Sequence, residues 1–162
     1  MKNLKKLTAL ALIGAMVLSL AGCGEKKITG KEFKKILKDE DFEVIEGDDD
    51  DYEENYTAIS EDGDVIIQYY LFEDKDDAKD DFEDGYEDLK DAKDDDEFEG
   101  TLKKSGNRST VKGEFDDNKM YGDSELYMVC IRVDEMMIVA LTADTSKSAV
   151  KDVDEALKAL GY

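Results

Sequence analysis

The sequence predicts an α+β domain: a mainly antiparallel sheet of about six or seven strands covered by three amphipathic helices. Several short segments are apolar at every second position or throughout, and turn residues join them, which is typical of strands linked by hairpins. Three other segments place apolar residues at helical spacing. The expected order is α-β-β-β-α-β-β-β-β-α, and the short connections favour antiparallel pairing.

The mature part of the chain begins with a helix. Thr29 and Glu32 form a capping box, and apolar residues follow at helical spacing, so we expect a helix over about residues 30–38. A short strand is expected at 42–45. The charged run at 47–54 predicts an exposed loop.

A hairpin and a long acidic helix follow. An Asp-Gly pair at 62–63 separates two strand-like runs, 56–60 and 65–72, and this pair is a strong hairpin signal. The second run, VIIQYYLF, is apolar almost throughout and is expected inside the sheet. Asp74 then caps a helix that extends to about residue 93. Its narrow apolar stripe consists of Ala78, Phe82, Tyr86, Leu89 and Ala92.

Four strands and a helix complete the order. We expect a looser segment at 116–123, between the second and third of these strands. The last helix starts near Ser146, and Gly161 lies where a glycine commonly ends a helix. The four strands are expected at 97–103, 109–115, 125–133 and 136–143.

The amino-terminal residues are typical of an export signal. Lys2, Lys5 and Lys6 precede an apolar run at 7–21, which is shorter than the ~20 residues that span a membrane. The run leads into Leu20-Ala21-Gly22-Cys23. This tetrapeptide resembles the lipobox of bacterial lipoproteins, in which the cysteine sulfur receives a diacylglyceryl group and the preceding peptide is removed.

The lipobox resemblance implies three regions. Residues 1–22 are a cleaved signal peptide, residues 23–28 are the lipidated Cys23 and a short tether, and residues 29–162 are a single acidic domain. Two acyl chains make anchoring stable, whereas one chain binds a membrane only reversibly. We therefore expect a lipid-anchored protein on the outer face of the cell membrane.

The rest of the chain is similar to small lipoproteins of Gram-positive bacteria. The matching parts are a first helix of the T-x-x-E-F-K type at 29–34 and the strand end Tyr70-Leu71-Phe72-Glu73-Asp74. An acidic helix with Ala78 to Phe82 follows, and the chain closes with Leu160-Gly161-Tyr162. These motifs are structural, so the resemblance implies location and fold and no activity.

Composition excludes several classes of function. The absence of histidine excludes Ser-His-Asp triads and histidine-containing metal sites. The net charge of −21 becomes −24 once residues 1–22, which carry three lysines and no acid, are removed. Such a charge argues against nucleic acid and is compatible with a cationic partner. After lipidation Cys130 is the only thiol, so an intrachain disulfide is excluded, and a cysteine within an apolar strand usually acts as a small hydrophobe.

The acidic runs are the candidates for metal binding. Adjacent carboxylates in a loop repel one another, and a bound calcium ion would relieve that repulsion. A solvated loop is the simpler interpretation of the same run. The candidate ligands are Asp48, Asp49, Asp50 and Asp51.

Three functional hypotheses follow. The first is a membrane-anchored, non-enzymatic binding or interaction module for an unknown protein or small molecule, because the chain combines an anchor with no catalytic set. The second is a low-affinity calcium-binding protein that uses the acidic loops. The third is a carboxylate-based hydrolase, although 43 acidic residues produce carboxylate pairs by chance. Tyr69, Tyr70 and Tyr86 are compatible with a pocket and equally with packing between helix and sheet.

Overall fold

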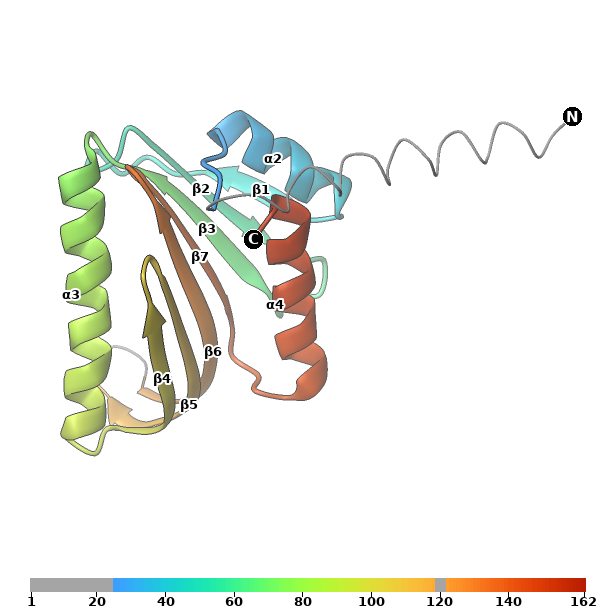
Figure 1. The fold of residues 1–162 in the computed structure, drawn as a ribbon. Coiled ribbons are helices and arrows are strands. Elements are labelled where there is room, and N and C mark those ends of the chain that lie inside the picture. The colour runs from blue at the N-terminus through green and yellow to red at the C-terminus, as the bar shows by residue number, and fades with distance from the viewer. Residues whose placement is uncertain (1–24, 119–121) are drawn as a thin grey trace, which may run out of the picture.

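The computed structural model describes residues 25–118 and 122–162. The predicted signal peptide and Cys23 lie outside these residues. The described elements follow the predicted order (Figure 1). They are α2 (Gly30–Asp39), β1 (Glu43–Glu46), β2 (Glu54–Ile59), β3 (Ile66–Leu71), α3 (Lys75–Asp94), β4 (Phe98–Ser105), β5 (Arg108–Asn118), β6 (Gly122–Val133), β7 (Met136–Thr142) and α4 (Lys147–Leu160).

The seven strands form one antiparallel sheet in the order β1-β2-β3-β7-β6-β5-β4. The α+β class, the three helices and the sheet are therefore as predicted. β3 pairs with β2 on one side and with β7 on the other, which confirms its predicted place inside the sheet. β3 and β7 are far apart in the chain. Their pairing joins strands β1–β3 to strands β4–β7 in one sheet.

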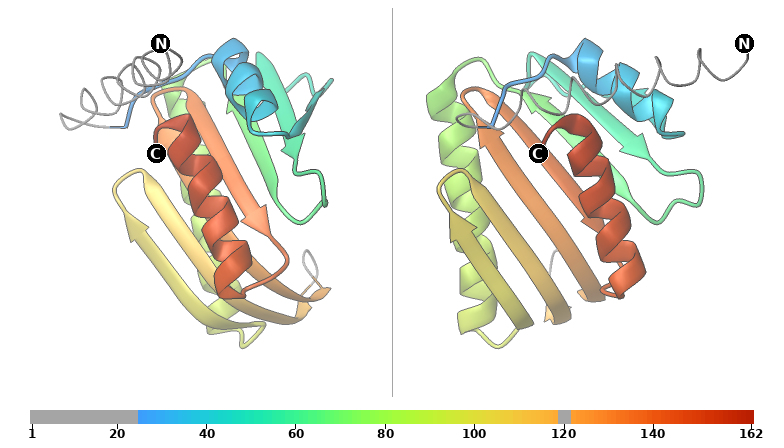
Figure 2. Two further views of the ribbon diagram at one scale, coloured as in Figure 1. Left: turned by 90° about the vertical axis from the view of Figure 1, so that its right-hand side faces the viewer. Right: turned by 45° about the vertical axis from the view of Figure 1, so that its right-hand side comes forward.

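The helices cover the two faces of the sheet unequally. α2 and α4 lie on one face and α3 lies on the other, as Figure 2 shows. Phe33 and Leu37 of α2 and Leu157 of α4 are almost fully buried against the first face. α3 has 20 residues, yet only Ala78, Phe82 and Leu89 of it are buried. The second face is therefore only partly covered.

Local signals set the helix ends as the sequence predicts. The Thr29 side chain accepts from the Glu32 backbone N–H at 3.2 Å, and the Glu32 carboxylate accepts from the Thr29 N–H at 2.8 Å. Ser146 caps α4, and Gly161 ends it with φ of 99°, a left-handed conformation that glycine adopts without strain.

The looser segment expected at 116–123 is wrong for the residues that the structure describes there. β5 continues to Asn118 and β6 begins at Gly122, and these two residues pair with each other. The register shifts between Phe115 and Asn118. Main-chain hydrogen bonds extend a hairpin without apolar side chains, and the sequence pattern detects only the side chains.

The described part of the predicted tether, residues 25–28, lies against the domain. The Tyr162 hydroxyl donates to the Lys26 carbonyl at 2.6 Å, and Lys27 forms an ion pair with Glu135. Ile28 is buried in the main core, and its carbonyl accepts from the Tyr69 hydroxyl at 3.3 Å. Contacts from three separate segments thus hold residues 26–28 against the domain. No helix among the described residues is long and apolar enough to cross a membrane.

Candidate functional site: a cleft between helix α3 and the sheet

A cleft with a cavity volume of about 650 Å³ lies between α3 and the second face of the sheet. β3, β7 and β6 supply its floor, α3 supplies one wall and Tyr52 closes one end. Most of the lining is apolar. The floor and wall residues include Gln68, Tyr70, Phe82, Gly85, Tyr86, Leu89, Met128, Cys130, Met137, Val139 and Leu141.

Strand alternation places the floor residues on this face. Successive side chains of a strand point to opposite faces, so Gln68 and Tyr70 face the cleft while Ile67 and Tyr69 enter the main core. The same alternation in β7 separates Val139, on the cleft face, from Ile138, in the core. The floor is therefore a sheet face that α3 leaves partly uncovered.

Gly85 keeps the wall of the cleft open. It lies three residues after Phe82 and four before Leu89, so it belongs to the face of α3 that is turned toward the sheet. A Cβ atom built at Gly85 meets nothing within 4 Å. Gly85 is also exposed, so the inward face of α3 leaves open space at this position.

Aromatic rings form one end of the cleft. The Tyr52 ring lies 4.7 Å from the Tyr70 ring and 5.0 Å, edge to face, from the Phe72 ring, measured between centroids. Burial, followed by the neighbouring Tyr52 and then by the negative charges of Asp81 and Asp49, raises the pKa of Tyr70 to about 12. Both tyrosines are therefore neutral at pH 7, and the Asp81 side chain lines the same cleft.

Burial raises the pKa of two groups in the cleft, the carboxyl group of Asp81 and the thiol of Cys130. Partial burial, with the nearby Asp84 carboxylate as the second cause, raises the pKa of Asp81 above its usual value. Burial, followed by the charge of Asp81, raises the pKa of Cys130 to about 12. Cys130 is 8% exposed and is a neutral thiol at pH 7, as expected for a small hydrophobic residue rather than a nucleophile.

The loop of the four predicted metal candidates lies between β1 and β2. Asp48, Asp49, Asp50 and Asp51 are all exposed there. The Asp49 carboxylate accepts from the Asp51 backbone N–H at 3.1 Å, so one of the four acts within the loop itself. In residues 25–118 and 122–162, no group of three or more Asp, Glu, Cys or His is arranged to hold a metal ion.

The three tyrosines considered from the sequence have different places. Tyr70 and Tyr86 line the cleft. Tyr69 is 1% exposed in the main core, with its ring 5.3 Å from that of Phe33. Period-two alternation separates Tyr69 from Tyr70, and this signal was available in the sequence.

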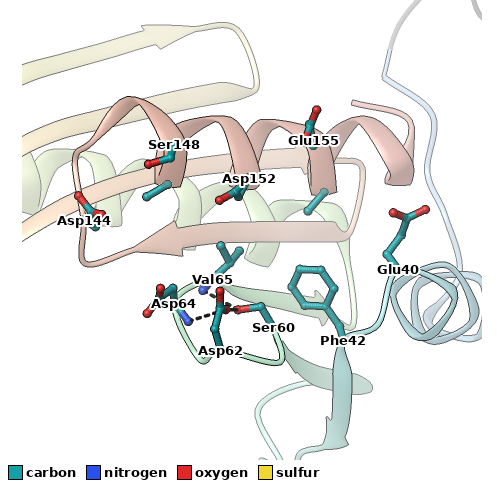
Figure 3. A pocket seen from close by; sticks show the side chains of 12 residues that line it. Glu40, Phe42, Ser60, Asp62, Asp64, Val65, Asp144, Ser148, Asp152 and Glu155 are labelled. Atoms are coloured by element: carbon teal, nitrogen blue, oxygen red, sulfur yellow. Dashed lines mark hydrogen bonds between the residues drawn. The ribbon is translucent and has the colours of Figure 1, made fainter.

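A second hollow, of about 280 Å³, lies between α4 and the β2–β3 hairpin (Figure 3). Several of its carboxylates serve the fold: Asp62 accepts from the Ser60 hydroxyl at 2.6 Å and from the Asp64 N–H at 3.3 Å. Asp144 accepts from the Ser146 N–H at 2.7 Å just before α4. Its acidic residues are Glu40, Asp62, Asp64, Asp144, Asp152 and Glu155.

Comparison with known proteins gives a limited result. No protein-family model matches the chain, and no curated protein matches it. A GTP-binding regulator from Thermotoga maritima is similar in structure, with a TM-score of 0.43 and 13% identity over 80% of this chain and 87% of that one. The extracellular domain of PknH from Mycobacterium tuberculosis has a TM-score of 0.37 and 14% identity over 81% of this chain and 92% of that one.

Proposed function

We propose that this protein is a non-enzymatic binding module, held on the outer face of the membrane by a lipidated Cys23, and that the cleft beneath α3 is its ligand site. The cleft carries the proposal. Its volume of about 650 Å³ lies within the range of small-molecule sites, ~300–1,000 Å³, and its lining is mainly apolar with a few polar groups.

The composition of the cleft supports binding rather than catalysis. A hydrolytic site needs a nucleophile with an adjacent base, or an isolated carboxylate pair. Here Cys130 is held as a neutral thiol, and the chain has no histidine to activate it. Tyr52 and Tyr70 are neutral phenols that offer ring faces and hydroxyl groups to a ligand.

A fluorescent titration tests the proposal. Every described element lies within residues 25–162, so a chain starting at Gly24 keeps the whole described core. N-phenyl-1-naphthylamine, a neutral probe that brightens in apolar sites, should bind this chain at one site. Gly85→Leu should weaken that binding because the new side chain occupies part of the cleft.

Asp80→Leu is the matched control for this titration. Asp80 is exposed on the opposite side of α3, so the same side chain is added to the same helix away from the cleft. Equal probe binding by the wild type and by Gly85→Leu would refute the cleft as the ligand site.

Low-affinity calcium binding by the loop of Asp48 to Asp51 is the alternative hypothesis from the sequence. It places the ion on carboxylates of the β1–β2 connection that do not line the cleft, and it requires no apolar ligand. A calcium-dependent rise in thermal stability that Gly85→Leu leaves unchanged would favour it over the cleft.

A further inference from the structure

We propose that the ligand of the cleft is a small organic cation with an apolar body, whose cationic group lies beside Asp81 and against the rings of Tyr52 and Tyr70. This inference rests on the proposed function and adds to it the chemical class of the ligand. It is carried by the distribution of charge on α3 and by the aromatic end of the cleft.

Charge on α3 is separated between its two flanks. At 100° per residue, the four lysines of the helix fall on one side of the inward stripe. Lys93 on this flank donates to the Gly100 carbonyl of β4 at 2.7 Å, so the basic flank faces the edge of the sheet. The lysines are Lys75, Lys79, Lys90 and Lys93.

The opposite flank of α3 borders the cleft and is acidic. Asp81 lines the cleft directly, and Gly85, which leaves it open, is on the same side. The acids of this flank are Asp77, Asp81, Asp84 and Asp88. All four are exposed on this flank, no lysine of α3 lies among them, and Asp81 is the one that lines the cleft. This flank is therefore an acidic rim beside an apolar floor.

The aromatic end adds a second preference for a cation. A cation near the face of a tyrosine ring is attracted by the negative electrostatic potential of that face. The ring centroids of Tyr52 and Tyr70 lie 4.7 Å apart, and Asp81 lines the same cleft. Rings and carboxylate thus surround one small region at the end of the cleft.

The charged groups of β4 do not cancel this preference. Lys104 lies over the rings of Phe82 and Tyr86, at 5.3 and 4.9 Å from their centroids, and forms an ion pair with Glu83. Glu83 is on the basic flank of α3, so this pair is on the other side of Phe82 from Asp81. Because Lys104 is paired with Glu83, it would not offset the repulsion between an anionic ligand and the acidic rim.

The apolar body of the ligand would lie on the floor of the cleft. Met128, Val139 and Leu141 are half-buried there and come from two neighbouring strands. A flexible thioether and two branched side chains adapt to alkyl or aromatic groups alike. A ligand with a cationic group and an apolar body would contact the acidic rim and the apolar floor at the same time.

Three competitors that share an octyl group and differ in charge test the preference for a cation. Octyltrimethylammonium, 1-octanol and octyl sulfate are titrated against bound N-phenyl-1-naphthylamine, with residues 24–162 at constant ionic strength. Octyltrimethylammonium should displace the probe at about a tenfold lower concentration than 1-octanol, from cation–π attraction and the Asp81 charge. Octyl sulfate should be the weakest.

Two asparagine variants separate a local effect from the charge of the whole protein. Asp81→Asn should bring octyltrimethylammonium close to 1-octanol, whereas Asp80→Asn, which removes the same charge from the far side of α3, should keep the preference. Equal displacement by the cation and the alcohol, or equal effects of the two variants, would overturn the inference while leaving the cleft as a binding site. Failure of the fluorescent probe itself to bind would overturn the proposed function instead.

Discussion

Substituting Gly85 should raise the stability of the protein, and a large side chain there should weaken ligand binding in the cleft. Glycine inside a helix costs about 1 kcal/mol relative to alanine. A Cβ at Gly85 meets nothing within 4 Å, so Gly85→Ala should recover that amount without a clash. Full burial of a leucine side chain contributes about 1.5–3 kcal/mol, and the cleft is half open, so Gly85→Leu should add about 1 kcal/mol more.

The assay for this prediction is urea unfolding followed by circular dichroism, together with thermal unfolding. At about 4 °C per kcal/mol for a domain of this size, Gly85→Ala should raise the midpoint by about 4 °C and Gly85→Leu by about 8 °C. The matched control is Gly63→Ala. Gly63 has a φ of 81°, where a Cβ is strained, so the same substitution should lower stability.

A destabilised Gly85→Ala would refute the argument, because it would mean that the inward face of α3 has no free space at this position. A stabilised Gly85→Leu that still binds the fluorescent probe would show that free space exists and is not the ligand site. The expected combination, higher stability with weaker binding, distinguishes an occupied cleft from general destabilisation, since most substitutions lower stability.

The remaining predictions concern charge, the tether, calcium and the anchor. Partial burial, followed by the Asp84 charge, raises the pKa of Asp81, so stability falls as pH rises from the unfolded pKa of this carboxyl to its folded pKa; Asp81→Asn should therefore increase stability at pH 7 and leave it unchanged at pH 3, measured by urea unfolding. Tyr162→Phe removes the hydrogen bond to the Lys26 carbonyl and should cost about 1 kcal/mol; trypsin should then cleave after Lys26 and Lys27 faster than in the wild type, and an unchanged rate would contradict the clamped tether. If the loop of Asp48 to Asp51 binds calcium, the ion at 100 times its dissociation constant should stabilise by about 2.7 kcal/mol beyond sodium chloride of equal ionic strength; equal effects of the two salts would mean screening alone. Cys23→Ala should move the protein from the membrane fraction to the soluble fraction, and retention on the membrane would count against the lipid anchor.

Elements with strong local signals could be predicted from the sequence. The capping box of Thr29 and Glu32 starts α2, and the Asp-Gly pair at 62–63 turns the β2–β3 hairpin. α4 begins at the predicted Ser146 cap and buries one apolar face, which consists of Ala149, Val153, Ala156, Leu157 and Leu160. Caps and turns act within a few residues, and the period of a stripe reports which face is buried, so these features are readable without the fold.

The cleft could not be predicted, although two of its signals were present. The narrow stripe of α3 and Gly85 within it are visible in the sequence, but they indicate only a helix that packs weakly. The opening also depends on where α3 lies across the sheet. Contacts with β4, such as Lys93 to the Gly100 carbonyl and Lys104 to Glu83, hold the helix toward one edge. Local sequence patterns do not specify such contacts between different elements, so the position of α3 on the sheet was not predictable from them.

The sequence by itself determined the order of the elements, the antiparallel class and the excess of negative charge, because local periodicity, turn chemistry and composition carry that information. The tertiary structure alone decided that β3 pairs with β7, that residues 25–28 are clamped by Tyr162 and Glu135, and that acids of α3 border a half-covered sheet face. Each of these depends on contacts between residues far apart in the chain, and burial and charge at such contacts are set only when the layers pack together.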